Sequence, residues 1–195
     1  MSTLPAGPAA VLLLPGWLNS GATHWQTRWE SRYGYQRVDQ ADWQWPRRGD
    51  WMARLDEVLQ QQTQPVLLAA HSLGCQLVAA WAAHSRHTSR VRGALLVAPP
   101  DTERADTPPQ LHNWRPIVRQ VLPFHGLVVS SRDDPFCSPQ RSAEMAADWG
   151  AAVSDIGDCG HINGDSGLAD WPQGHAWLMA LNGTAGRGPT GGVDR

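Results

Sequence analysis

The residues from Pro65 to Trp81 constrain the fold of this chain more than any other stretch. The apolar run after Pro65 has the length of a buried strand and is too short for a helix. An Ala-rich segment without proline follows, from Leu73 to Ala83, and predicts a helix. Between them stands Ala70-His71-Ser72-Leu73-Gly74, one residue away from the G-x-S-x-G pattern of a nucleophile elbow.

A nucleophile elbow holds its serine on a strained turn between strand and helix, with the hydroxyl clear of the backbone. The turn needs small residues two positions before and two positions after the serine. Ala70 and Gly74 meet this need, although Ala70 departs from the strict pattern. The alternative interpretation is that Ser72 only caps the helix, a role that serine favours. A base and an acid elsewhere in the chain are required to decide for the elbow.

The length and the charge of the chain limit the number of domains and the class of partner that we expect. With 195 residues, the chain is expected to form a single domain over residues 1–182, followed by a flexible tail over residues 183–195 that is rich in Gly, Pro and Thr. Its net charge is −2 and it has no lysine, so the basic side chains are all arginines. No arginine cluster is dense enough for a nucleic-acid surface, and we therefore predict no nucleic-acid partner.

The cysteines and the N-terminal region point to a soluble cytoplasmic protein. Cys75, Cys137 and Cys159 are scattered without the paired spacing of a metal site, so we expect free thiols, a reducing compartment and no zinc. The apolar run Ala9–Leu14 is short and ends at Pro15-Gly16, which predicts a strand and not a signal peptide. No stretch is long enough to span a membrane, and no membrane partner is predicted. Nothing in the sequence calls for a cofactor or a metal.

Buried strands alternate with helices along the chain. The strands are predicted over Ala9–Leu14, Tyr35–Val38, the apolar run after Pro65, Val91–Ala98, Phe124–Ser131 and Ala151–Ile156. The helices are predicted over residues 24–33, 50–62, 73–83, 139–149 and 171–181, with Thr23, Asp50 and Ser138 as caps. This alternation predicts a three-layer α/β protein with a mostly parallel sheet of six strands and helices on both faces.

Three polar side chains follow strands of this sheet, at the edge where sites are built. Ser72 follows the third strand, Asp133-Asp134 follow the fifth and His161 follows the sixth. The chain order Ser, Asp, His is that of α/β-hydrolases. An imidazole within reach can take the proton of a serine hydroxyl, and a carboxylate can hold the imidazole in the right tautomer. Taken singly, Asp133-Asp134 is an ordinary turn and His161 a solvated loop residue. Their conjunction predicts a catalytic triad, and the choice between the two aspartates stays open.

Other histidines compete for these roles. His71 is adjacent to Ser72, but successive side chains of a strand point in opposite directions, so it should not reach the hydroxyl. His84 and His87 resemble a metal pair, but they lack carboxylate or cysteine neighbours in the sequence and are interpreted as exposed residues near a helix C-terminus. Two backbone N–H groups are expected to stabilise a developing oxyanion, namely those of Leu73 and Trp17.

Seven short motifs of the chain resemble those of one family, the small serine hydrolases related to human retinoblastoma-binding protein nine and the bacterial YdeN proteins. The motifs are Pro15-Gly16-Trp17, residues 24–29, Asp42-Trp43 with Pro46, Asp50-Trp51, residues 70–75, residues 133–136 and residues 158–161. The resemblance covers Val11 to about Leu181. It implies a compact α/β-hydrolase fold without a large cap domain, with Ser72 as nucleophile, His161 as base and Asp134 as the orienting acid. It also implies hydrolysis of esters or amides.

The segment between the fourth and fifth predicted strands is too short for a helical cap, and it is predicted to be a loop or a small lid. The pocket is therefore expected to be shallow and partly open. Trp17, Trp43, Trp45 and Trp114 lie on predicted loops, and one or two of them are expected to line it. These features favour small acyl groups or exposed peptide ends over long lipids.

Two other functions compete with the serine hydrolase. The first is a binding or interaction module that keeps the hydrolase fold without turnover. The second is thiol chemistry at Cys137 or at Cys159, which stands two residues before His161. A protein partner is compatible with the sequence but not indicated by it.

Overall fold

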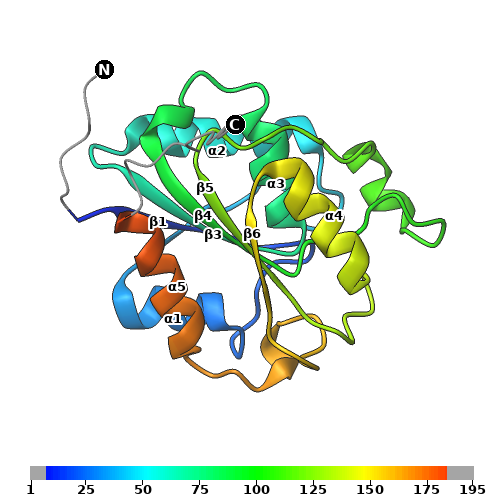
Figure 1. Ribbon diagram of the computed structural model, residues 1–195. Coiled ribbons are helices and arrows are strands. Elements are labelled where there is room, and N and C mark those ends of the chain that lie inside the picture. Colours follow the sequence, from blue (N-terminus) through cyan, green and yellow to red (C-terminus); the bar gives the residue numbers. More distant parts are fainter. Residues whose placement is uncertain (1–7, 184–195) are drawn as a thin grey trace, which may run out of the picture.

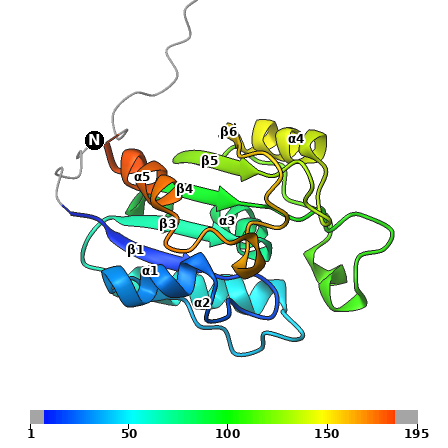
Figure 2. The same cartoon turned by 90° about the horizontal axis from the view of Figure 1, so that it is seen from below.

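The computed structural model describes residues 8–183 of the chain. A single six-stranded sheet runs through these residues. Its strands are β1 (Ala10–Leu14), β2 (Gln36–Arg37), β3 (Val66–His71), β4 (Val91–Val97), β5 (His125–Ser130) and β6 (Ala152–Asp155). All neighbouring pairs are parallel, in the order β2-β1-β3-β4-β5-β6. The predicted sheet is confirmed, and it is fully parallel within the described part of the chain. The strand arrows point the same way, so their carboxyl ends share one edge (Figure 2).

Five α-helices cover the sheet on both faces. They are α1 (Trp25–Tyr33), α2 (Arg48–Gln61), α3 (Leu73–Ala82), α4 (Pro139–Trp149) and α5 (Pro172–Ala180). Helices α2, α3 and α4 lie on one face and α1 and α5 on the other (Figure 1). Short 3₁₀ turns occur at Thr88–Arg90, Pro109–Trp114, Gly164–Ser166 and Leu181–Gly183. No helix among the described residues is both long and apolar enough to cross a membrane.

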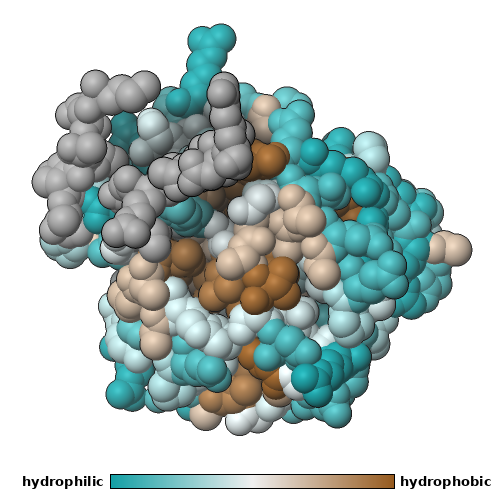
Figure 3. All heavy atoms as spheres, in the orientation of Figure 1, coloured by the Kyte–Doolittle hydropathy of each residue, from teal (hydrophilic) through white to brown (hydrophobic). Residues whose placement is uncertain are grey.

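The pleat of the strands divides the apolar side chains between two cores. In β1, Leu12 and Leu14 pack towards α2 and α3, whereas Val11 and Leu13 pack towards α1 and α5. The same alternation recurs in β3 and β4, because successive side chains of a strand point to opposite faces. Strand β6 closes one edge of the sheet, where Val153 is 48% exposed and apolar residues reach the surface (Figure 3).

Two predicted helix caps are wrong. Helix α1 is capped by His24 and not Thr23, because the Nδ1 atom of His24 accepts the N–H of Gln26. Helix α2 begins two residues before Asp50, which therefore lies in the first turn and not at the cap position. Ser138 caps α4 as predicted, with its hydroxyl accepting the N–H of Arg141.

The order of the strands places a functional edge between β1 and β3. The chain leaves β1 outward to β2 and then returns past β1 to β3, so the direction of winding reverses between these two neighbours. In open parallel sheets, ligands bind at the carboxyl ends of the strands beside such a switch point. Gly16-Trp17 follows β1, and Ser72 follows β3. Of the predicted tail, residues 184–195 lie outside the described part of the chain, as do residues 1–7.

Candidate active site

Ser72 occupies the turn between β3 and α3 in a strained backbone conformation. Its φ of 53° and ψ of −123° lie outside the regions that a serine ordinarily adopts. Its hydroxyl makes no capping hydrogen bond to α3, so the interpretation of Ser72 as a simple helix cap is wrong. The backbone N–H of Ser72 instead donates to the carbonyl of Val97 at the end of β4, 2.9 Å away. The strain therefore presents the hydroxyl at the carboxyl edge of the sheet.

Two glycines allow this turn to pack closely against β1. A Cβ at Gly74 would lie 2.2 Å from the carbonyl oxygen of Leu14, and one at Gly16 would lie 2.6 Å from the Cβ of Ser72. Neither position has room for a side chain. The first small position of the elbow is less demanding, because the methyl group of Ala70 is fully buried in the core without disturbing the strand pairing. Gly16 was identified from the sequence only as part of the Pro15-Gly16-Trp17 motif, and its own role was not predicted, because that role comes from a contact with a distant segment.

A chain of hydrogen bonds joins Ser72, His161 and Asp134. The Nε2 atom of His161 lies 2.8 Å from the Oγ of Ser72. Its Nδ1 atom lies 3.0 Å from each carboxylate oxygen of Asp134. The side chains of His161 and Asp134 are 10% and 3% exposed, so the acid is shielded while the imidazole keeps some access to solvent.

The two adjacent aspartates have different partners. Asp134 lies behind the His161 ring and also accepts the N–H of Phe136. Asp133 accepts the hydroxyl of Ser131 and the N–H of Gly160, each at 2.7 Å. These two hydrogen bonds, that from Ser131 foremost, lower the pKa of Asp133. Asp133 thus ties the loop before His161 to the end of β5, and Asp134 alone faces the imidazole.

Of the two predicted oxyanion donors, Leu73 directly follows the serine and Trp17 follows Gly16, which lies against Ser72. Within residues 8–183, neither the N–H of Trp17 nor that of Leu73 donates a hydrogen bond to a protein acceptor. The loop carrying Trp17 is held by its indole N–H, which donates to Gln44, and by the N–H of Leu18, which donates to Trp43. Gly16 brings the same loop against Ser72. Among the described residues, both N–H groups are therefore without a protein acceptor and belong to segments that adjoin Ser72.

Exposed apolar side chains lie on loops at the same carboxyl edge of the sheet. The ring of Phe136 stands 4.6 Å from that of His161, edge to face, and Phe136 is 52% exposed. Leu18 and Trp45 are also exposed, whereas Trp114 is buried in the core and presents no surface to a ligand. Sequence reasoning predicted no role for Phe136 or Leu18. Phe136 was only the last residue of the motif over residues 133–136, and Leu18 only followed Trp17.

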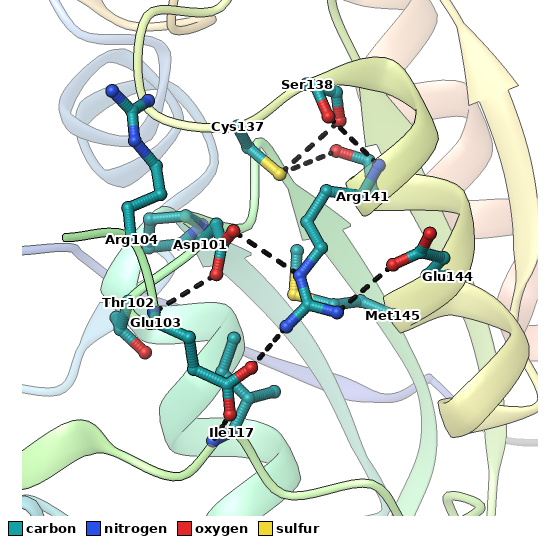
Figure 4. Close-up of polar contacts among 12 residues, drawn as sticks. Asp101, Thr102, Glu103, Arg104, Ile117, Cys137, Ser138, Arg141, Glu144 and Met145 are labelled. Carbon is teal, nitrogen blue, oxygen red and sulfur yellow. Dashed lines mark hydrogen bonds and ion pairs between the residues drawn. The ribbon is translucent and has the colours of Figure 1, made fainter.

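The segment between β4 and β5 is fastened to α4 by charged side chains (Figure 4). Arg141 of α4, which is 15% exposed, contacts the carboxylates of Asp101, Glu103 and Glu144. Glu103 also accepts the N–H of Ile117, and the N–H of Asp101 donates to the carbonyl of Phe136. The segment between β4 and β5 was predicted to be a loop or a small lid, and these contacts favour the loop. Through Asp101, the segment also supports the turn that carries Asp134.

The competing nucleophiles and ligands are not assembled into a site. Burial raises the pKa of the thiols of Cys75 and Cys159 and raises that of Cys137 to about 11, which disfavours the reactive thiolate. His87 contacts the carboxylate of Asp56, and His84, just after α3, contacts the carbonyl of Ala80 in that helix. No group of three potential metal ligands occurs between residues 8 and 183.

A cavity of about 310 Å³ opens between the loop after β2 and the start of α2. Its lining is charged and includes Asp39, Asp50 and Arg54, with Trp51 as its aromatic member. Ser72, Asp134 and His161 are not among the residues that line it. The residues of the hydrogen-bonded chain from Ser72 to Asp134 therefore lie outside this cavity.

Comparison with known proteins identifies the family. Residues 11–180 match the family model described as serine hydrolase. The chain belongs to the serine hydrolase family. No curated protein sequence matches it significantly.

Several solved structures have a fold similar to that of this chain. A YdeN-like hydrolase from Pectobacterium atrosepticum is 28% identical, with a TM-score of 0.79 over 89% of this chain and 90% of that one. The ydeN gene product of Bacillus subtilis is 21% identical, with a TM-score of 0.68 over 89% and 98% of the two chains. An esterase from Rhodococcus is 16% identical and superposes with a TM-score of 0.68 over 94% of each chain. The α/β-hydrolase fold without a large cap and the YdeN-like resemblance are thus both confirmed.

Proposed function

We propose that this member of the serine hydrolase family cleaves small ester or amide substrates through an acyl-enzyme on Ser72. The observation that carries the proposal is the continuous hydrogen-bonded chain from the Ser72 hydroxyl through His161 to the Asp134 carboxylate. A serine placed only for structure would need neither a strained turn nor an imidazole backed by a buried acid.

In the first half of the reaction, the oxygen of Ser72 attacks the carbonyl carbon of the substrate while its proton passes to Nε2 of His161. Asp134 accepts the hydrogen on Nδ1 and stabilises the imidazolium that forms. The negative charge that develops on the substrate oxygen is met by the N–H groups of Trp17 and Leu73. Loss of one such donor lowers kcat about 10²–10³-fold in related chemistry.

Collapse of this intermediate breaks the bond to the leaving alcohol or amine, which takes the proton from His161. A water molecule then gives its proton to His161 and attacks the acyl-serine, which releases the acid and restores the hydroxyl. Each proton returns to its starting group, so the cycle needs no cofactor.

The proposed substrates are small because the segment between β4 and β5 builds no helical cap to enclose a long chain. Its one regular element is the 3₁₀ turn Pro109–Trp114. We expect p-nitrophenyl acetate and butyrate to be cleaved with higher kcat/KM than the octanoate and longer esters. A maximum at long acyl chains would contradict this part of the proposal.

The assignment of Ser72 is tested by Ser72→Ala. The variant should lose about 10⁶-fold in kcat and all labelling by a fluorophosphonate probe, because the groups of a triad act as a unit. His161→Ala should lose a similar factor. Equal labelling of wild type and Ser72→Ala would show that another residue is the nucleophile.

The alternative function is a binding module that keeps the fold without turnover. Exposed Leu18, Trp45 and Phe136 at the carboxyl edge are the features that favour it. A wild-type protein that folds normally, resists fluorophosphonate and turns over no member of a broad ester and amide panel would support this alternative.

A further inference from the structure

Two buried donors hold the backbone of the loop that carries His161. The Nε2 atom of His71 lies 2.8 Å from the carbonyl oxygen of His161, and the indole N–H of Trp25 donates to the next carbonyl, that of Ile162, at 2.9 Å. Ile162 has a φ of 49°, which is unfavourable for a branched side chain and persists only where the surroundings impose it. The loop that carries His161 is therefore held in place by hydrogen bonds from His71 of β3 and Trp25 of α1.

The direction of the His71 hydrogen bond fixes its protonation. A carbonyl oxygen only accepts, so Nε2 of His71 must carry the hydrogen. Burial, with His24 and His161 nearby, holds the pKa of His71 well below its ordinary value. His71 is thus a neutral imidazole, and as such it places no positive charge beside the base.

The ring of His71 is also fixed by its neighbours. His24 packs against it with ring centroids 4.6 Å apart, and Trp25 lies edge-on at 6.2 Å. His24 is itself anchored, since its Nδ1 atom accepts the N–H of Gln26. His71 is 5% exposed. Its donor therefore has little freedom to follow a displaced loop.

We propose that His71 is a positioning residue that sets the distance between the Ser72 hydroxyl and the His161 imidazole. His71 and Ser72 are consecutive, so one short segment contacts both the backbone and the side chain of residue 161. Strand alternation directs the His71 side chain away from the Ser72 hydroxyl, as predicted from the sequence. The side chain instead contacts the backbone of the loop that carries His161. The inference rests on the proposed hydrolase function.

Two amide substitutions test the hydrogen bond with matched chemistry. His71→Gln can place an amide N–H near the position of Nε2, whereas His71→Asn carries the same group one bond short. We expect His71→Asn to lower kcat about 10–100-fold with KM within about twofold, because small misplacements of catalytic groups are costly. His71→Gln should recover to within a few-fold of wild type. Equal activities of the two variants, whether both normal or both impaired, would overturn the proposal.

If the variants do not fold, a measurement on the wild type tests the hydrogen bond from His71 to the backbone of His161. In imidazole ¹⁵N NMR, His71 should show the neutral tautomer with hydrogen on Nε2 throughout pH 5–8. The opposite tautomer, or titration within this range, would overturn the proposal. Fluorophosphonate labelling of the wild type tests the hydrolase function separately, so the two failures are distinguishable.

Discussion

At the scale of single residues, the site is defined by which atoms face one another. Two adjacent aspartates of the same charge divide into an acid that backs His161 and a carboxylate that ties Ser131 to Gly160. The resemblance to known hydrolases favoured Asp134, and the pattern of residues alone did not separate it from Asp133. Only the side-chain contacts distinguish them.

These contacts predict different effects for the two aspartates. Asp134→Asn should lower kcat about 10⁴-fold, because an amide favours the wrong tautomer of the base. Asp133→Asn keeps an oxygen acceptor for Ser131 and Gly160 and should change kcat much less. Steady-state kinetics on a p-nitrophenyl ester measures both. The reverse ranking would mean that Asp133 is the acid.

At the scale of elements, the start of helix α1 illustrates how a buried histidine couples folding to pH. His24 is 4% exposed, and burial, with a contribution from Arg37, lowers its pKa to about 3. Its Nδ1 atom serves as the helix cap, so the neutral form is the one the fold requires.

This lowered pKa predicts acid sensitivity with a definite sign. Below about pH 6.5 the unfolded chain gains a proton at His24, whereas the folded protein does so only near pH 3. The free energy of unfolding should therefore decrease as the pH is lowered through this window. His24 contributes up to about 1.4 kcal/mol to this decrease per pH unit. Urea unfolding between pH 7.5 and 4.5 measures the slope.

Two variants of His24 separate titration from capping. His24→Asn keeps a capping acceptor and should lower the pH slope with little loss of stability at pH 7.5. His24→Ala should lower the slope as well, but it should also cost about 1 kcal/mol at pH 7.5. A slope in both variants equal to that of the wild type would contradict the prediction.

At the scale of the whole molecule, the site depends on segments that converge from distant parts of the chain. The segment between β4 and β5 reaches the Asp134 turn through the N–H of Asp101 and through Arg104, which donates to the carbonyl of Pro135. Arg141 holds that segment against α4 (Figure 4).

Removal of Arg141 should therefore weaken the attachment of this segment to α4. Arg141→Met keeps the apolar stem but leaves Asp101 and Glu103 without their shared cation, and we expect a loss of about 2–3 kcal/mol in the free energy of unfolding. Urea unfolding checks this. The control is Arg132→Met, because the ion pair of Arg132 with Asp155 is exposed and its loss should not be measurable. Equal stability of the two variants would contradict the prediction.

The sequence alone determined the layers, the strand order along the chain and the three residue types of the site. Those features depend on local patterns, namely apolar runs of strand length, helical spacing and polar residues at strand ends. The caps at Thr23 and Asp50 were wrong because several neighbouring polar residues suit a helix start, and the local pattern does not choose among them.

Only the tertiary structure decided which groups meet. The closeness of Gly16 to Ser72, the support of His161 by His71 and the edge-on contact of Phe136 with the imidazole all join residues far apart in the chain. Such contacts follow from the parallel sheet, which brings its carboxyl ends to one edge, and from the packing of loops across that edge. A sequence pattern records the residue types, but the distances between them are set by the fold.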